Sequence, residues 1–199
     1  MPTLPLIHKI KRISPSRLFN IEQLSLEFSN GEKRLYERLV PGDVGAVIVV
    51  PIIDAENILL IREYAAGIHA YEVGLPKGGL EANESILDAA NRELKEEAGF
   101  GARKLDYLTS LSLAPGYMTH HTHIVLARDL YPESLPGDEP EEIETLQWPI
   151  ARIGDLVNRT DCSEGRSLAA LYLARDFLEG KWQPADTSPP DAYINTNEE

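Results

Sequence analysis

The sequence is poor in sulfur residues and in positive charge. Its 199 residues include one cysteine and two methionines, and they carry 32 acidic side chains against 19 lysines and arginines. Cys162 alone cannot form a disulfide within the chain, which fits a reducing compartment, and we interpret it as an ordinary thiol. The formal net charge of −13 argues against the cationic surface that nucleic acids or anionic membranes require. We therefore expect neither as a partner.

Long apolar runs and zinc-binding spacings are also missing. The longest apolar run, residues 45–53, is far too short to span a membrane, and the N-terminus lacks the apolar core of a signal peptide. None of the five histidines is spaced with a cysteine as a zinc site requires, so we expect His120, His121 and His123 in a surface loop. No internal repeat is visible. These features predict a cytoplasmic protein with one domain of ordinary size and a small appendage.

Residues 78–100 contain the strongest local signals. Ser85 followed by Asp88 resembles a capping box, and Gly99 is a natural left-handed helix end, so the sequence predicts a helix over residues 85–98. A stripe of apolar residues along this helix would pack on a core. Its members are Leu87, Ala90, Leu94 and Ala98.

Three glutamates would crowd a neighbouring face of that helix. Glu93, Glu96 and Glu97 are spaced by three and four residues, which places them on one patch. Like charges at this spacing destabilise a helix slightly, so a purely stabilising role explains them poorly. A solvated acidic face is one interpretation. A site for a hard divalent cation such as Mg²⁺, which prefers carboxylate oxygens, is the other.

The spacing of the whole stretch favours the cation site. Gly78, Glu84, Arg92-Glu93, Glu96-Glu97 and Gly99 match every fixed position of the Nudix box. At roughly 6% usage for each of the seven fixed residues, the chance match is about 3 × 10⁻⁹ per starting point. The chain therefore resembles the Nudix hydrolase superfamily, and the likeness extends over roughly residues 44–180.

This resemblance implies an α/β fold, the Nudix α/β/α sandwich with a mixed sheet, plus a small N-terminal β hairpin or sheet. The expected organisation is an N-terminal β segment for dimerisation and part of the pocket at 1–42, a Nudix domain at 43–182 and a flexible tail at 183–199. Alternation and turn signals predict a hairpin over residues 17–39, with its turn at Asn30-Gly31. Further strands are expected at 44–53, 58–64, 105–113, 123–127 and 143–150, with late helices at 153–157 and 167–178. Leu168, Leu171, Tyr172 and Leu178 are the expected buried residues of the last helix.

The resemblance also implies the chemistry. Nudix enzymes use divalent cations to hydrolyse a nucleoside diphosphate linked to another group, and the cofactor expected here is Mg²⁺, with Mn²⁺ or another divalent cation as an alternative. By position in the box, Glu93 and Glu97 are the principal metal ligands, and Glu96 is a third or outer ligand. The carbonyl of Lys77 would add a backbone ligand. Glu84 would either bind the metal through water or hold Arg92, whose guanidinium can order the carboxylates.

A base must orient the attacking water. In the ADP-ribose pyrophosphatase branch it comes from an acidic loop before a late strand, and residues 137–143 lie where that loop should be. We expect Glu139 as the base and Glu141 as a further metal ligand. A solvated charge run is the alternative for either residue.

Substrate markers are mixed. Pro115 has the placement associated with ADP-ribose pyrophosphatases, whereas Tyr117 is near the tyrosine position of diadenosine polyphosphate hydrolases. Taken together with residues 61–64, 90–97, 100–102 and 129–135, the chain looks most like the bacterial ADP compounds hydrolases. That group accepts ADP-ribose, NADH and diadenosine polyphosphates and releases AMP. The expected substrate is thus a small ADP-linked molecule, and the expected assembly is a homodimer. Candidates for contact with the nucleotide or its phosphates are Arg38, Arg62, Lys77, Pro115 and Tyr117.

Two other functions are weighed against hydrolysis. A Nudix module that senses ADP-ribose or NAD without turnover would not need the intact glutamate set. A capped or triphosphorylated RNA substrate is disfavoured by the acidic balance. The sequence leaves the preferred substrate, the preferred metal and the identity of the base open.

Overall fold

The computed structural model describes residues 3–16, 19–41 and 45–190, which belong to two compact units. The first unit contains the described residues up to Pro41 together with Ser112–His121. The second unit contains residues 45–111 and the described chain from Thr122 onward. The segment 112–121 thus leaves the second unit and returns to it.

The first unit is a three-stranded antiparallel sheet in the order β1-β2-β3. The predicted turn is confirmed, because Gly31 has a φ of 82° and its N–H donates to the Phe28 carbonyl at 2.9 Å. One long strand replaces the two short runs expected before that turn, and β1 was not predicted. Two register shifts interrupt β1, which explains why its sequence lacks regular alternation. The strands are β1 (Leu6–Pro15), β2 (Phe19–Glu27) and β3 (Lys33–Pro41).

The segment Ser112–His121 joins this unit through the edge of β3. Leu39 donates its N–H to the Tyr117 carbonyl at 2.7 Å, and its own carbonyl accepts from the Thr119 N–H at 3.1 Å. The predicted substrate residues Pro115 and Tyr117 therefore belong to the N-terminal unit.

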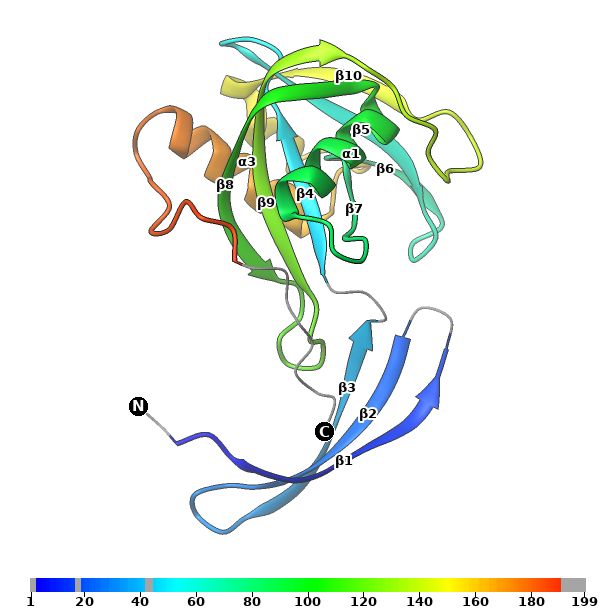
Figure 1. Cartoon of the computed structure of the whole chain (residues 1–199), viewed down its shortest axis with the longest axis vertical. Coiled ribbons are helices and arrows are strands. Elements are labelled where there is room, and N and C mark those ends of the chain that lie inside the picture. Colours follow the sequence, from blue (N-terminus) through cyan, green and yellow to red (C-terminus); the bar gives the residue numbers. More distant parts are fainter. Residues whose placement is uncertain (1–2, 17–18, 42–44, 191–199) are drawn as a thin grey trace. The chain divides into compact units, whose positions relative to one another are not determined.

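The second unit contains two sheets, ordered β7-β4-β9-β8 and β10-β5-β6 (Figure 1). Strands β4 and β9 run parallel, whereas β4 and β7, and the pairs of the smaller sheet, run antiparallel. The larger sheet contains β4 (Ala46–Pro51), β7 (Lys77–Gly79), β8 (Phe100–Ser112) and β9 (His121–Pro132). The smaller sheet contains β5 (Asn57–Ala65), β6 (Ala70–Gly74) and β10 (Glu144–Pro149).

Helices cover both faces of this unit. Because successive strand residues point to opposite faces, Val47 and Val49 of β4 pack in the cluster that includes α1, whereas Ile48 and Val50 pack in the cluster that includes α3. The predicted α/β/α sandwich with a mixed sheet is therefore confirmed. The helices are α1 (Ile86–Ala98), α2 (Ile153–Leu156) and α3 (Gly165–Leu178), with a short 3₁₀ turn, η1 (Ile150–Arg152), before α2.

Two predictions about side-chain burial were wrong. Leu178 is 38% exposed at the last residue of α3, whereas Ala170 and Ala174, earlier in the same helix, face the core. His121 and His123 lie on β9 rather than in a surface loop, and His123 is 2% exposed with its Nδ1 3.4 Å from the Tyr107 hydroxyl.

The chain after α3 returns toward β8. Gln183, Ala185 and Asp186 line a surface pocket with Tyr107 and Thr109 of that strand. The remainder of the predicted flexible tail, residues 191–199, lies outside the described part of the chain. None of the helices formed by the described residues has the length and apolar character needed to cross a lipid bilayer.

Candidate active site

Helix α1 places two glutamates in the protein interior. Its start and end are as predicted, since the Ser85 hydroxyl accepts from the Asp88 N–H at 3.1 Å and Gly99 caps the helix with a φ of 73°. Glu93 and Glu97 lie one turn apart and are only 7% and 5% exposed. They share the buried side of the helix with Leu94, which packs toward the sheet. A solvated acidic face therefore does not describe these two carboxylates.

Strand β7 runs directly against this pair. The Lys77 N–H donates to Glu97 Oε2 at 2.8 Å, which holds the carboxylate against the strand. A Cβ atom at Gly78 would overlap the Glu93 carboxylate, so a side chain there would force that carboxylate to move. The box glycine is thus required by a close approach between strand and carboxylate.

Arg92 binds the carboxylates at the edge of the site. Its Nε and Nη2 donate to Glu84 at 2.8 and 3.0 Å, and its Nη1 donates to Glu93 at 2.7 Å and Glu96 at 2.9 Å. A further bond runs from Nη2 to the Gly79 carbonyl at 2.9 Å. The hydrogen bonds to Glu84 raise the pKa of Arg92 further, so the guanidinium stays charged. Of the two roles considered for Glu84, the structure shows the one in which it holds Arg92.

The deepest groups of the site have perturbed ionisation. Burial raises the pKa of Glu97 to about 8, despite the opposing charge of the nearby Lys77 ammonium, and burial likewise raises the pKa of Glu93. Burial also lowers the pKa of Lys77, whose ammonium pairs with Glu63. The site therefore disfavours the charges that it contains, which is the condition under which a bound cation is most stabilising.

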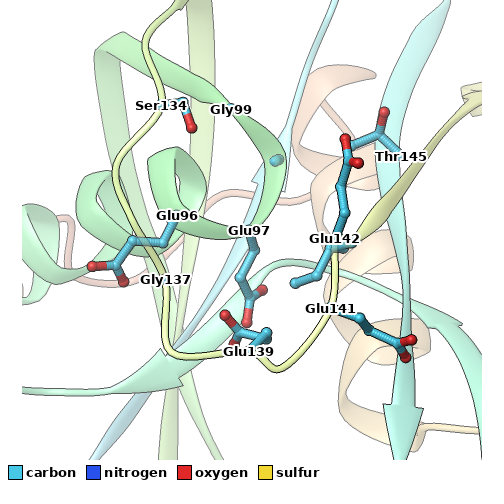
Figure 2. A pocket seen from close by; sticks show the side chains of 11 residues that line it. Glu96, Glu97, Gly99, Ser134, Gly137, Glu139, Glu141, Glu142 and Thr145 are labelled. Carbon is cyan, nitrogen blue, oxygen red and sulfur yellow. The ribbon is translucent and has the colours of Figure 1, made fainter.

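The acidic loop between β9 and β10 lines a pocket together with glutamates of α1. Glu139 and Glu141 from the loop, with Glu96 and Glu97 from α1, line a pocket of about 360 Å³. Figure 2 shows the Glu139 and Glu97 side chains directed toward one another, whereas Glu141 points away. The charge of Glu139 contributes to the raised pKa of both Glu93 and Glu97, which places it close to both. Glu139 thus faces Glu97, and its role as the base stays a prediction.

A second pocket shares the loop as a wall. It has a volume of about 390 Å³, and Arg62, Tyr64 and Tyr71 line it together with Glu139 and the residues after it. The Arg62 guanidinium donates to Glu144 at 2.9 Å and to Asp161 at 2.7 Å, so it is already paired within the protein. Arg62 therefore lines a pocket next to the site with its charge compensated by two carboxylates, and its contact with substrate stays a prediction.

The other predicted substrate contacts belong to the N-terminal unit. Arg38 donates to Glu22 at 3.0 and 2.8 Å across β2 and β3, and Tyr117 is 58% exposed. Their part in substrate binding, like that of Pro115, stays a prediction.

Sequence reasoning missed two residues of the site. Glu63 pairs with the Lys77 ammonium, and the Tyr71 hydroxyl donates to Glu141 Oε1 at 2.6 Å. Both come from the β5–β6 hairpin, where Glu63 and Tyr71 occupy adjacent rungs. No local pattern marks them, because their roles depend on which residues the hairpin faces.

Comparison with known proteins identifies the family. The model of the NUDIX domain matches residues 43–159, and that of the NudE-type Nudix hydrolase N-terminal domain matches residues 5–38. The chain belongs to the Nudix hydrolase family. It is 49% identical over 177 residues to the ADP compounds hydrolase NudE of Escherichia coli, covering 89% of this chain and 95% of that protein.

Other relatives agree. An ADP-ribose pyrophosphatase of Bacillus subtilis is 28% identical over 82% of this chain and 91% of its own length. A crystal structure of an ADP compounds hydrolase superposes with a TM-score of 0.84 at 47% identity, covering 91% of this chain and 97% of that one. The sequence-based resemblance and the enzyme class are thereby confirmed.

Nudix hydrolases use divalent cations, and the donors of this Nudix site suit one. Among residues 3–16, 19–41 and 45–190, no three acidic, histidine or cysteine side chains already converge as a ligand set. Arg92 donates to both Glu93 and Glu96 in this arrangement. The donor chemistry nevertheless fits, because Glu93 and Glu97 are buried carboxylates whose charge burial opposes.

Proposed function

We propose that this protein hydrolyses the diphosphate bond of ADP-linked compounds, such as ADP-ribose, NADH and diadenosine polyphosphates, to AMP and a phosphorylated product. The observation that carries the proposal is the buried Glu97 facing Glu139 across one pocket, with the equally buried Glu93 one turn away on the same helix. The extended similarity to a protein described as an ADP compounds hydrolase supports the substrate class.

The proposed cofactor is Mg²⁺, held by Glu93, Glu97 and the Lys77 carbonyl, with Glu96 as an outer ligand. When bound, it would neutralise the diphosphate and polarise the phosphorus centre. Other residues of the chain hold the metal-binding carboxylates in place. Arg92 orders the carboxylates through its bonds to Glu93 and Glu96. The Lys77 N–H fixes Glu97.

Glu139 is the proposed base. It is half-buried on the loop and directed toward Glu97, so it can accept a proton from a water between loop and helix (Figure 2). Glu141, by contrast, is bound by Tyr71, which disfavours the metal-ligand role considered for it from the sequence.

The test is AMP release from ADP-ribose, NADH and diadenosine triphosphate, with Mg²⁺ and with EDTA. We expect metal-dependent AMP from the parent and a loss of at least 100-fold in kcat for Glu97→Gln. Binding of ADP-ribose with no AMP from any of the three compounds would instead favour a non-catalytic sensor.

A cytoplasmic homodimer completes the proposal. The lone Cys162 fits a reducing compartment. Several large apolar side chains of the N-terminal sheet are exposed, which is typical of a surface that a second copy covers. They are Leu6, Ile7, Ile10, Ile13, Leu35 and Tyr36. We expect light scattering to give twice the mass of 22.1 kDa for the parent and the single mass for Ile10→Glu, and a monomeric parent would contradict the dimer.

A further inference from the structure

The acidic loop is fastened at both ends. At its start, Glu133 pairs with the Lys95 ammonium at 2.8 Å and donates its N–H to the Gly99 carbonyl at 3.1 Å, and the Leu135 N–H donates to the Lys95 carbonyl at 3.2 Å. At its far end, Glu141 Oε1 accepts from the Tyr71 hydroxyl at 2.6 Å. Glu139 lies between these anchors, so both of them constrain it.

The Tyr71 hydroxyl is itself held in place by the β5–β6 hairpin. Tyr71 pairs with Tyr64 across the two strands, and their rings meet edge to face with centroids 5.9 Å apart. The Tyr64 hydroxyl lies 2.7 Å from His69 Nδ1, which fixes that ring in turn. The hairpin thus presents one hydroxyl to the loop.

The position of Glu141 constrains that of Glu139, because the two residues are close neighbours in the loop. Pro140 separates Glu139 from Glu141, and its ring fixes one of the backbone dihedrals between them. The two glutamates point in different directions, with Glu139 toward Glu97 and Glu141 away (Figure 2). The Tyr71 hydroxyl binds Glu141 where it points away from Glu97. This bond therefore favours the loop conformation in which Glu139 faces the buried carboxylates.

We propose that Tyr71 is a positioning residue, which binds Glu141 and thereby holds Glu139 over Glu97. This inference rests on the proposed function, since it assigns Glu139 as the base. It also gives the two loop glutamates different roles. Glu139 is the base, and Glu141 holds the loop in place.

The first test is Tyr71→Phe, which removes only the hydroxyl. Without this bond the loop should hold Glu139 over Glu97 for a smaller fraction of the time, which predicts a fall in kcat for ADP-ribose of roughly 10-fold. KM and the Mg²⁺ concentration for half-maximal activity should stay within twofold. Tyr107→Phe, on the edge strand β8 of the larger sheet, is the control and should retain the parental kcat. A parental kcat in Tyr71→Phe would overturn the proposal.

Substitutions of Glu141 distinguish an anchor from a metal ligand. Glu141→Gln keeps an oxygen that can accept from Tyr71, so we expect activity within about threefold of the parent, whereas Glu141→Leu should match Tyr71→Phe. The double variant Tyr71→Phe/Glu141→Leu should be no worse than either single change, because both break the same bond. Multiplied losses in the double variant, or a large loss in Glu141→Gln, would contradict the anchor.

A measurement independent of activity follows the loop itself. In Tyr71→Phe we expect amide hydrogen exchange of residues 137–142 to accelerate several-fold, while residues 86–98 exchange as in the parent. Unchanged amide hydrogen exchange in residues 137–142 would refute the positioning role of Tyr71, whichever compound is the substrate. Suppose that exchange is faster in Tyr71→Phe but the parent protein releases no AMP. That result would support the positioning role of Tyr71 and count against the proposed function alone.

Discussion

Replacing Glu97 by glutamine should stabilise the metal-free protein while abolishing its activity. The folded protein raises the pKa of this carboxyl from an ordinary 4.5 to about 8, chiefly through burial. That change corresponds to about 5 kcal/mol against the ionised form. Glutamine has the same shape, carries no charge and can still accept from the Lys77 N–H. The substitution therefore removes the penalty and keeps the contact.

The sign of the pH dependence follows from the direction of the shift. Below about pH 4.5 the carboxyl is protonated in both the folded and the unfolded chain, so the parent bears no penalty. As pH rises toward 8, only the unfolded chain ionises freely, and the parent loses stability relative to the variant. At pH 7 the expected difference in free energy of unfolding is about 3 kcal/mol, or roughly 6–12 °C in Tm.

The assay is urea and thermal denaturation in EDTA at pH 5, 7 and 8, for the parent, Glu97→Gln and the exposed control Glu37→Gln. With Mg²⁺, the parent should gain stability at pH 8 and the Glu97 variant should gain little, because a bound cation needs the charge that burial opposes. A Glu97→Gln protein that is no more stable than the parent, or whose advantage is equal at pH 5 and pH 8, would refute this reasoning.

Three further outcomes are expected. Gly78→Ala should lower kcat at least 10-fold and cost about 1–3 kcal/mol in urea denaturation, because the added Cβ displaces the buried Glu93 carboxylate. A parental kcat would contradict it. Arg92→Met should cost about 2–4 kcal/mol, since it leaves Glu84 and the helix carboxylates without their cation, and equal stability would count against that role. Cys162, 3% exposed and with a pKa raised by burial, should react with a disulfide reagent at least 100-fold more slowly in the folded protein than in urea, as stopped-flow absorbance would measure.

Local sequence signals predicted helix α1 and strand β4. Ser85 and Gly99 set the ends of α1 through bonds within a few residues, and these ends were predicted correctly. The apolar run over β4 was also read correctly, because a strand covered on both faces needs apolar side chains on both. Residues 6–15 were missed as a strand, since their register shifts interrupt the alternation on which such predictions depend.

The sequence by itself also determined the family and the glutamates of the box, because their spacing along one helix fixes which side chains share a face. Tertiary structure alone decided how those side chains are held. It brings Glu63 to Lys77 and Tyr71 to Glu141, and the second pair is separated by 70 residues in the chain. It likewise buries Glu97 deeply enough to raise its pKa. Such contacts depend on how a hairpin, a helix and a loop pack together, and no short-range pattern encodes that packing.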